Sequence, residues 1–143
     1  TRTEREVSWD ITVDTDGTVL QQNDPAHRAC WHAGHVNGWT LGIEMVQHAD
    51  TGDLWQVQVD ATVAVVGALC GALAIPPRVP VDASGAPLAG QVKAWQSAKE
   101  GGRGERWAGV LGHHHVTRNK GDGDPGADIF RALLAAGFEG VRS

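Results

Sequence analysis

The chain has 143 residues, which is enough for one domain with a hydrophobic core. Hydrophobic residues make up 41% and charged residues 20%, as in ordinary globular proteins. The net charge of −5 argues against a nucleic-acid-binding protein, which would usually carry a basic patch. Residues 1–6 are polar and no apolar run is long enough to cross a bilayer, so we expect neither a signal peptide nor a membrane span in this chain.

The first third of the chain has the pattern of short strands joined by turns and one long loop. Apolar and polar residues alternate over 7–13, which predicts a half-buried strand. A turn is indicated at 14–17, and the returning strand at 18–21. Residues 23–37 are rich in Asp, Pro, His, Gly and Asn and predict a long loop, which in a compact domain is often functional. A further strand is expected at 40–47.

Helical periodicity begins at residue 59. Over 59–74, apolar residues recur at spacings of four, three, four and three and predict a core-facing stripe of Val59, Val63, Val66, Cys70 and Leu73. Pro76-Pro77 is expected to end this helix. The apolar surroundings of Cys30 and Cys70 favour two buried free thiols over a disulfide.

The second half combines short strands with a final helix. Val79 and Val81 predict a short strand, and residues 83–105 an excursion with a short helix near 92–99. Val110 and Leu111 predict a last short strand leading into three histidines. A helix is expected over 128–136, with Gly137 as its stop. The elements together predict a mixed α/β fold.

Glu44 is the first candidate for chemistry. Within its strand, Leu41, Ile43 and Met45 share one face, so Glu44 is expected on the other. A solvated strand carboxylate is one interpretation. The functional alternative is a carboxylate on a rigid strand that can deprotonate a catalytic water.

The second candidate is the histidine run His113-His114-His115 together with Asp124. Imidazole and carboxylate are ligand types that zinc accepts in hydrolytic sites. Neighbouring side chains in extended backbone point to opposite faces, so His113 and His114 are not expected to bind the same ion. Asp124 precedes Pro125-Gly126 at a helix start and can serve either as N-cap or as ligand.

Several of these segments share a family resemblance in the same order along the chain. The segments are Val7-Ser8-Trp9, Asp16-Gly17-Thr18-Val19, Trp31-His32-Ala33-Gly34, Asn37, Leu41-Gly42-Ile43-Glu44, Ile75-Pro76-Pro77, Gly112-His113 and Asp124-Pro125-Gly126. Together they resemble the type 2 N-acetylmuramoyl-L-alanine amidases, a superfamily that includes phage endolysins and the peptidoglycan recognition proteins. The resemblance covers about residues 7–138.

The resemblance implies a central mixed β-sheet flanked by helices and a zinc groove. It implies cleavage of the amide between N-acetylmuramic acid and L-alanine of peptidoglycan. Carried over to this chain, His113 and Asp124 match zinc ligands, and Glu44 matches the glutamate that acts on the catalytic water. Lys120 is the candidate for stabilising the oxyanion, with a solvated loop lysine as the alternative. The residues that the resemblance places near the zinc or along the substrate groove are Trp9, Trp31, His32 and Asn37.

Two departures from the family pattern matter. The family's first zinc histidine lies upstream of the Val-Ser-Trp segment, where this chain has none, so we expect residues 1–143 to form one amidase-like domain that is incomplete at its N-terminus. The family's lysine precedes the acidic ligand by two residues, a position that Asp122 occupies here. Asp122 as the ligand would restore the spacing to Lys120, but Pro-Gly follows Asp124, which we prefer.

Three functions therefore remain open. The first is a zinc amidase of lytic, antimicrobial type that acts on the cell wall from outside, or from the host cytoplasm before lysis in the case of an endolysin. The second is a peptidoglycan-binding module of the recognition type without catalysis. The third is a structural domain that reuses the scaffold. Trp31 and Trp39 flank the long loop and can stack on sugar or peptide, whereas Trp55, Trp95 and Trp107 fit the core equally well.

Overall fold

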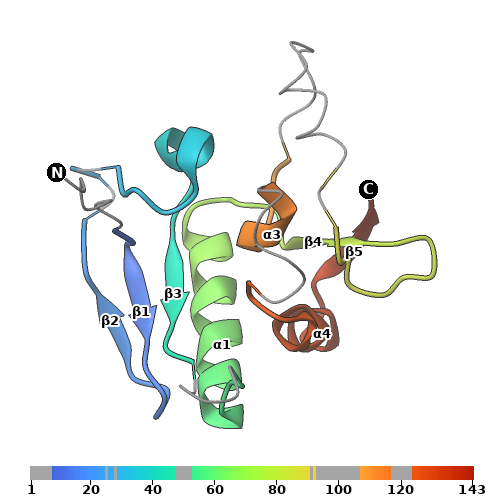
Figure 1. The fold of residues 1–143 in the computed structure, drawn as a ribbon, viewed down its shortest axis with the longest axis horizontal. Coiled ribbons are helices and arrows are strands. Elements are labelled where there is room, and N and C mark those ends of the chain that lie inside the picture. The colour runs from blue at the N-terminus through green and yellow to red at the C-terminus, as the bar shows by residue number, and fades with distance from the viewer. Residues whose placement is uncertain are drawn as a thin grey trace, which may run out of the picture. The chain divides into compact units, whose positions relative to one another are not determined.

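The computed structural model describes residues 8–24, 26–27, 29–47, 53–90, 92, 107–116 and 124–143. These residues form strands and helices in the mixed α/β arrangement that the sequence predicts (Figure 1). The chain divides into two compact units, residues 1–62 and 63–143. No helix in the described ranges is long and apolar enough to cross a membrane.

The first unit contains a mixed three-stranded sheet in the order β2-β1-β3. Strand β1 (Ile11–Val13) pairs antiparallel with β2 (Val19–Gln21) and parallel with β3 (Ile43–Met45). The predicted turn at 14–17 is confirmed, with the amide of Gly17 donating to the carbonyl of Asp14 over 3.0 Å. Gly17 has a φ of +83°, and a Cβ there would also meet Val57 at 3.0 Å, so this turn requires glycine.

Strand β3 is shorter than the predicted 40–47 because a side chain takes the place of a ladder hydrogen bond. The carbonyl of Gly42 accepts from the amides of Asp10 and Ile11, whereas its amide donates to the carboxylate of Asp10 over 2.8 Å. Before this strand, the predicted loop contains a 3-10 helix, η1 (Gly34–Trp39).

Helix α1 (Gln56–Ala72) begins three residues earlier and ends two residues earlier than predicted. Of the predicted stripe, Val59, Val66 and Cys70 are buried. Leu73 was wrongly assigned to it: the helix has ended, Ala74 adopts a φ of +53°, and Leu73 is 52% exposed. Cys30 and Cys70 are both buried free thiols, as predicted.

Gln58 ties the start of α1 to the sheet. Its side chain is fully buried, and Nε2 donates to the carbonyls of Val13 (2.9 Å), the last residue of β1, and Val46 (2.8 Å), the residue after β3. A buried polar group is stabilised only when it is hydrogen-bonded, and one amide group serves two strands here.

We therefore expect Gln58→Leu to lower the free energy of unfolding by about 1–3 kcal/mol, because it removes two hydrogen bonds that contribute roughly 0.5–1.5 kcal/mol each. Gln56→Leu is the matched control, because Gln56 lies in the same turn but is exposed, and its side chain donates to the exposed carboxylate of Asp60. This control should shift stability by less than about 0.5 kcal/mol. Urea unfolding measures both, and equal losses would contradict the role of Gln58.

The second unit has a two-stranded parallel sheet of β4 (Arg78–Val81) and β5 (Glu139–Arg142). Helix α4 (Ala127–Ala135) precedes β5 and buries Ile129, Phe130 and Leu133. Gly137, with a φ of +95°, ends this helix as predicted. Strand β5 has no counterpart among the sequence predictions, since Glu139, Gly140 and Arg142 are exposed and give it no apolar alternation.

The predicted strand at Val110 and Leu111 is wrong. Residues 107–112 have no regular secondary structure, although the amide of Val110 donates to the carbonyl of Arg78 over 2.8 Å. Gly109 has a φ of +145°, which breaks the extended conformation directly before these residues. The predicted short helix near 92–99 lies outside the described residues, apart from Val92, which is buried.

Candidate functional site

The second unit brings together the predicted pair His113 and Asp124. The histidine run was predicted to continue as extended backbone. It instead forms a single helical turn, α3 (His113–Val116). Nδ1 of His113 lies 3.5 Å from Oδ2 of Asp124, and the two side chains are 27% and 42% exposed. An imidazole nitrogen and a carboxylate oxygen, eleven residues apart in sequence, therefore face each other at an accessible position.

The side chains of the other two histidines are buried and contact the backbone of the fold. His114 is buried, with Nδ1 3.0 Å from the backbone carbonyl of Asp124. His115 is fully buried: its Nδ1 accepts from the amide of Gly112 (2.9 Å) and its Nε2 donates to the carbonyl of Leu88 (2.8 Å). Of the three side chains, His113 is the one placed to offer a ring nitrogen to a ligand beside Asp124.

Burial lowers the pKa of His115 from 6.5 to about 4. Below pH 6.5 the imidazole of His115 is protonated in the unfolded chain but stays neutral in the folded protein. The free energy of unfolding is therefore highest above pH 6.5 and falls as the pH drops from 6.5 to 4. The loss amounts to at most about 3–4 kcal/mol, at 1.36 kcal/mol for each pKa unit between 6.5 and 4. Urea unfolding between pH 4 and 8 with a chelator should be flatter for His115→Gln by this amount. Equal slopes for the two proteins would contradict the assignment.

Asp124 does not cap the helix that follows it. The N-cap residue of α4 is Gly126, and no side-chain hydrogen bond caps this end. The cap interpretation of Asp124 is therefore wrong, and its carboxylate is directed at His113 instead.

The donor set of this pair fits zinc in chemistry and in spacing. Two ligands with bonds of about 2.0–2.1 Å to a tetrahedral zinc lie roughly 3.3 Å apart, close to the 3.5 Å between Nδ1 and Oδ2. Within the part of the chain that the structure describes, no group of three or more His, Cys, Asp or Glu side chains could hold a metal ion. Lys120 and the alternative ligand Asp122 lie outside the described residues.

The first unit carries Glu44 on strand β3. Its backbone is in register with Thr12 of β1. Leu41, Ile43 and Met45 are half-buried and Glu44 is exposed, which confirms the predicted separation of faces. The carboxylate is thus accessible on a strand that is fixed by its pairing.

The loop before β3 holds the remaining predicted site residues. Oδ1 of Asn37 accepts from the amides of His32 (3.2 Å) and Ala33 (2.7 Å), so this oxygen shapes the loop. Nε2 of His32 lies 2.8 Å from Oγ1 of Thr40. Trp31 is 65% exposed. Trp9 is half-buried, and its indole N–H donates to Oγ1 of Thr12 over 2.6 Å.

Sequence reasoning missed Asp10, which the alternation over 7–13 placed among the polar positions of a half-buried strand. The side chain is only 2% exposed, and its carboxylate accepts from the amide of Gly42 and from the thiol of Cys30 (3.2 Å). The pKa of His32 is lowered mainly by burial, with the negative charge of Asp10 opposing the shift. No local signal in the sequence marks Asp10, because its partners Cys30 and Gly42 lie 20 and 32 residues away.

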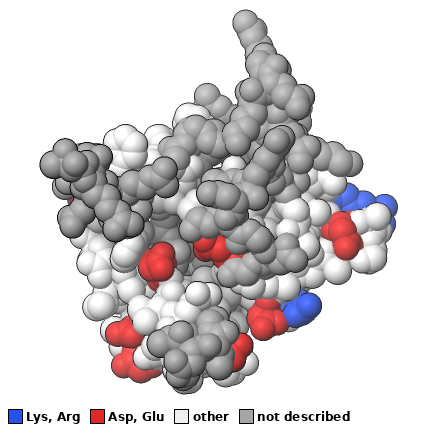
Figure 2. Space-filling view, in the orientation of Figure 1, with Lys and Arg blue, Asp and Glu red and all other residues white. Residues whose placement is uncertain are grey.

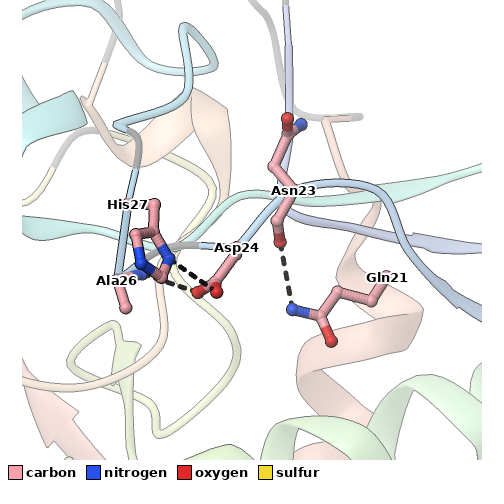
Figure 3. A network of polar contacts seen from close by, with 5 residues as sticks. All are labelled: Gln21, Asn23, Asp24, Ala26 and His27. Carbon is pink, nitrogen blue, oxygen red and sulfur yellow. Dashed lines mark hydrogen bonds and ion pairs between the residues drawn. The ribbon is translucent and has the colours of Figure 1, made fainter.

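The loop after β2 forms a small polar network at the surface (Figure 3). The carboxylate of Asp24 accepts from the amide of Ala26 (2.9 Å) and pairs with Nδ1 of His27 (2.8 Å), and the amide group of Gln21 donates to the carbonyl of Asn23. The ring of His27 is largely exposed, so this pair contributes at most about 1 kcal/mol. This network fixes a turn and offers no enclosed site.

Two exposed basic side chains among the described residues of the second unit are paired with acidic ones. Arg78 bonds to Glu139 and Arg131 to Asp128, at 2.8 and 2.6 Å. In the face shown in Figure 2, the blue basic side chains lie beside red acidic ones. The described residues on that face therefore form no basic patch.

The molecule is thus a mixed α/β protein with an accessible His–Asp pair in one unit and a strand glutamate in the other. A family model described as N-acetylmuramoyl-L-alanine amidase matches residues 1–127. The chain belongs to this family of peptidoglycan amidases, which confirms the resemblance seen in the sequence. No curated protein and no solved structure matches the chain significantly.

Proposed function

We propose that the chain is a zinc-dependent N-acetylmuramoyl-L-alanine amidase that hydrolyses the amide between the lactyl group of N-acetylmuramic acid and L-alanine. The observation that carries this proposal is the 3.5 Å approach of His113 and Asp124, at the end of the segment that the family model matches. The proposal treats residues 1–143 as one amidase-like domain.

His113 and Asp124 would hold the metal through Nδ1 and Oδ2. When bound there, zinc supplies Lewis acidity that activates water and polarises the scissile carbonyl. The partial exposure of both side chains leaves this position open to a substrate. His114 and His115 keep their ring nitrogens in contacts within the fold.

Glu44 is proposed as the general base. Its carboxylate takes a proton from the attacking water and passes it to the amine of L-alanine as the carbon–nitrogen bond breaks. Its exposure on a paired strand supports this role. Lys120 is proposed to stabilise the oxyanion of the tetrahedral state, on the basis of the family resemblance.

The proposed substrate residues are Trp9, Trp31, His32 and Asn37. The exposed indole of Trp31 offers a face for stacking on sugar or peptide. Asn37 acts by shaping the loop that presents Trp31 and His32, since its Oδ1 accepts from two amides of that loop. We propose that the protein acts at the bacterial cell wall, from outside or, as an endolysin, from the host cytoplasm before lysis.

A second candidate function is a peptidoglycan-binding module of the recognition type without catalysis. It is favoured by one observation, that the described residues include no group of three metal ligands. The two candidates differ in the products that they leave on peptidoglycan.

Incubation of purified peptidoglycan with the chain separates them. The amidase should release new α-amino groups of L-alanine without new reducing sugar ends, and a chelator should stop the release. Binding of the chain to peptidoglycan in a pull-down, with no new amino groups at any zinc concentration, would favour the recognition module. New reducing ends would contradict both.

A further inference from the structure

His114 lies between the two residues of the proposed metal pair and is not assigned to any part of the reaction. Its side chain is 4% exposed. Its backbone amide donates to the carbonyl of Asp124 over 3.2 Å, and Nδ1 of its ring lies 3.0 Å from the same oxygen. One carbonyl of residue 124 thus receives two contacts from one histidine.

Both ring nitrogens of His114 face backbone carbonyl oxygens. Nδ1 lies 3.0 Å from the carbonyl of Asp124, and Nε2 lies 3.2 Å from the carbonyl of Leu88, which also accepts from His115. A carbonyl oxygen can only accept, so in the neutral ring the nitrogen that carries the proton is the one that donates. We assign the proton to Nδ1, the nitrogen with the shorter contact, so that the ring donates to Asp124.

The surroundings of the ring leave it little room to move. A Cβ on Gly112 would lie 2.8 Å from Cε1 and Nδ1 of His114 and 3.0 Å from the carbonyl oxygen of Asp124. On another side, the ring meets that of Phe130 edge to face, with centroids 5.9 Å apart. Since the core is packed closely around it, the imidazole acts as a rigid spacer between α3 and residue 124.

We propose that His114 is a positioning residue that holds the backbone of Asp124 against α3, so that the Asp124 carboxylate and His113 are preorganised to bind one zinc ion. This inference rests on the proposed function, because it assumes that His113 and Asp124 are the ligands. It assigns to His114 no contact with metal or substrate. Its effect is on zinc affinity, because ligands that must first be ordered bind metal more weakly.

The test is isothermal titration of the metal-free chain with Zn²⁺ alone, for the wild type and four variants. His113→Ala and Asp124→Ala remove the proposed ligands. His114→Leu keeps a side chain of similar bulk but removes the donor. His114→Asn keeps an N–H donor near the position of Nδ1. Urea unfolding of each variant establishes that it is folded at the temperature of the titration.

We expect His114→Leu to raise the Kd for zinc about 10–100-fold, the range found when groups that orient metal ligands are lost. His114→Asn should recover most of this loss, which a role in packing alone would not explain. Zinc binding that requires His113 and Asp124 but is unchanged in His114→Leu overturns this inference and leaves the proposed function standing. Zinc binding that is absent, or indifferent to His113 and Asp124, overturns both. Equal losses in His114→Leu and His114→Asn also overturn the inference.

Discussion

Replacing Glu44 by glutamine is expected to lower kcat for muropeptide hydrolysis about 10²–10⁴-fold, the usual contribution of a positioned general base. Glutamine has the size of glutamate and can stay on the same exposed strand position, but it cannot accept the proton of the attacking water. Zinc affinity should be unchanged, because Glu44 is not one of the proposed ligands. This combination separates loss of the base from loss of the metal.

Glu139→Gln is the matched control for this change. Glu139 is also an exposed glutamate on a strand, β5, where it pairs with Arg78. Its replacement should leave kcat within about twofold of the wild type, since exposed ion pairs contribute little. Steady-state kinetics on a defined muropeptide measure both variants. A Glu44→Gln protein as active as Glu139→Gln would remove Glu44 from the reaction.

Gly42→Ala is expected to have the second largest effect, because His32 packs directly on this glycine. A Cβ at residue 42 would lie 2.6 Å from Cγ and 2.9 Å from Nδ1 of His32, which is closer than real Cβ atoms approach. The ring must therefore move, although its contact with Thr40 holds it in place. We expect a stability loss of about 1–3 kcal/mol, as for other overpacked sites.

The same substitution should lower kcat/KM about 10²-fold if His32 contacts the substrate, since a displacement of about 1 Å near a reacting group costs this much. Gly38→Ala is its control: Gly38 lies in η1 of the same loop, and a Cβ there meets nothing within 4 Å. Urea unfolding and muropeptide kinetics compare the two. If Gly42→Ala loses stability but retains kcat/KM, His32 has a structural role only.

Local patterns in the sequence predicted much of the fold because they reflect local physics. The turn at 14–17 depends on Gly17, and the end of α4 depends on Gly137, both at positive φ. The stripe at Val59, Val66 and Cys70 follows from helical periodicity. The assignment of Leu73 to the stripe was wrong because the apolar periodicity continues beyond the end of the helix, where Ala74 adopts a positive φ. Strand β5 was missed because its partner β4 lies more than fifty residues away in sequence.

Less of the candidate site could be predicted, because its contacts join residues that follow no regular spacing along the chain. The approach of His113 to Asp124 confirms that the two residues chosen from the sequence lie together, but the roles of their neighbours could not be deduced. Adjacent histidines were expected to alternate between faces, and instead α3 turns His114 and His115 inward. Asp10 occupies a polar position in an alternating pattern, and its burial depends on two donors that are distant in sequence, the thiol of Cys30 and the amide of Gly42.

The most direct test of the account is hydrolysis of a defined N-acetylmuramoyl peptide by the wild-type chain, His113→Ala and Asp124→Ala, followed by mass spectrometry across a zinc titration. The account predicts that the wild type releases the free stem peptide in the presence of zinc and stops with a chelator. Both variants should lose the reaction at zinc concentrations that saturate the wild type. Release of stem peptide that persists with the chelator, or that is equal in all three proteins, would contradict a zinc amidase built on His113 and Asp124.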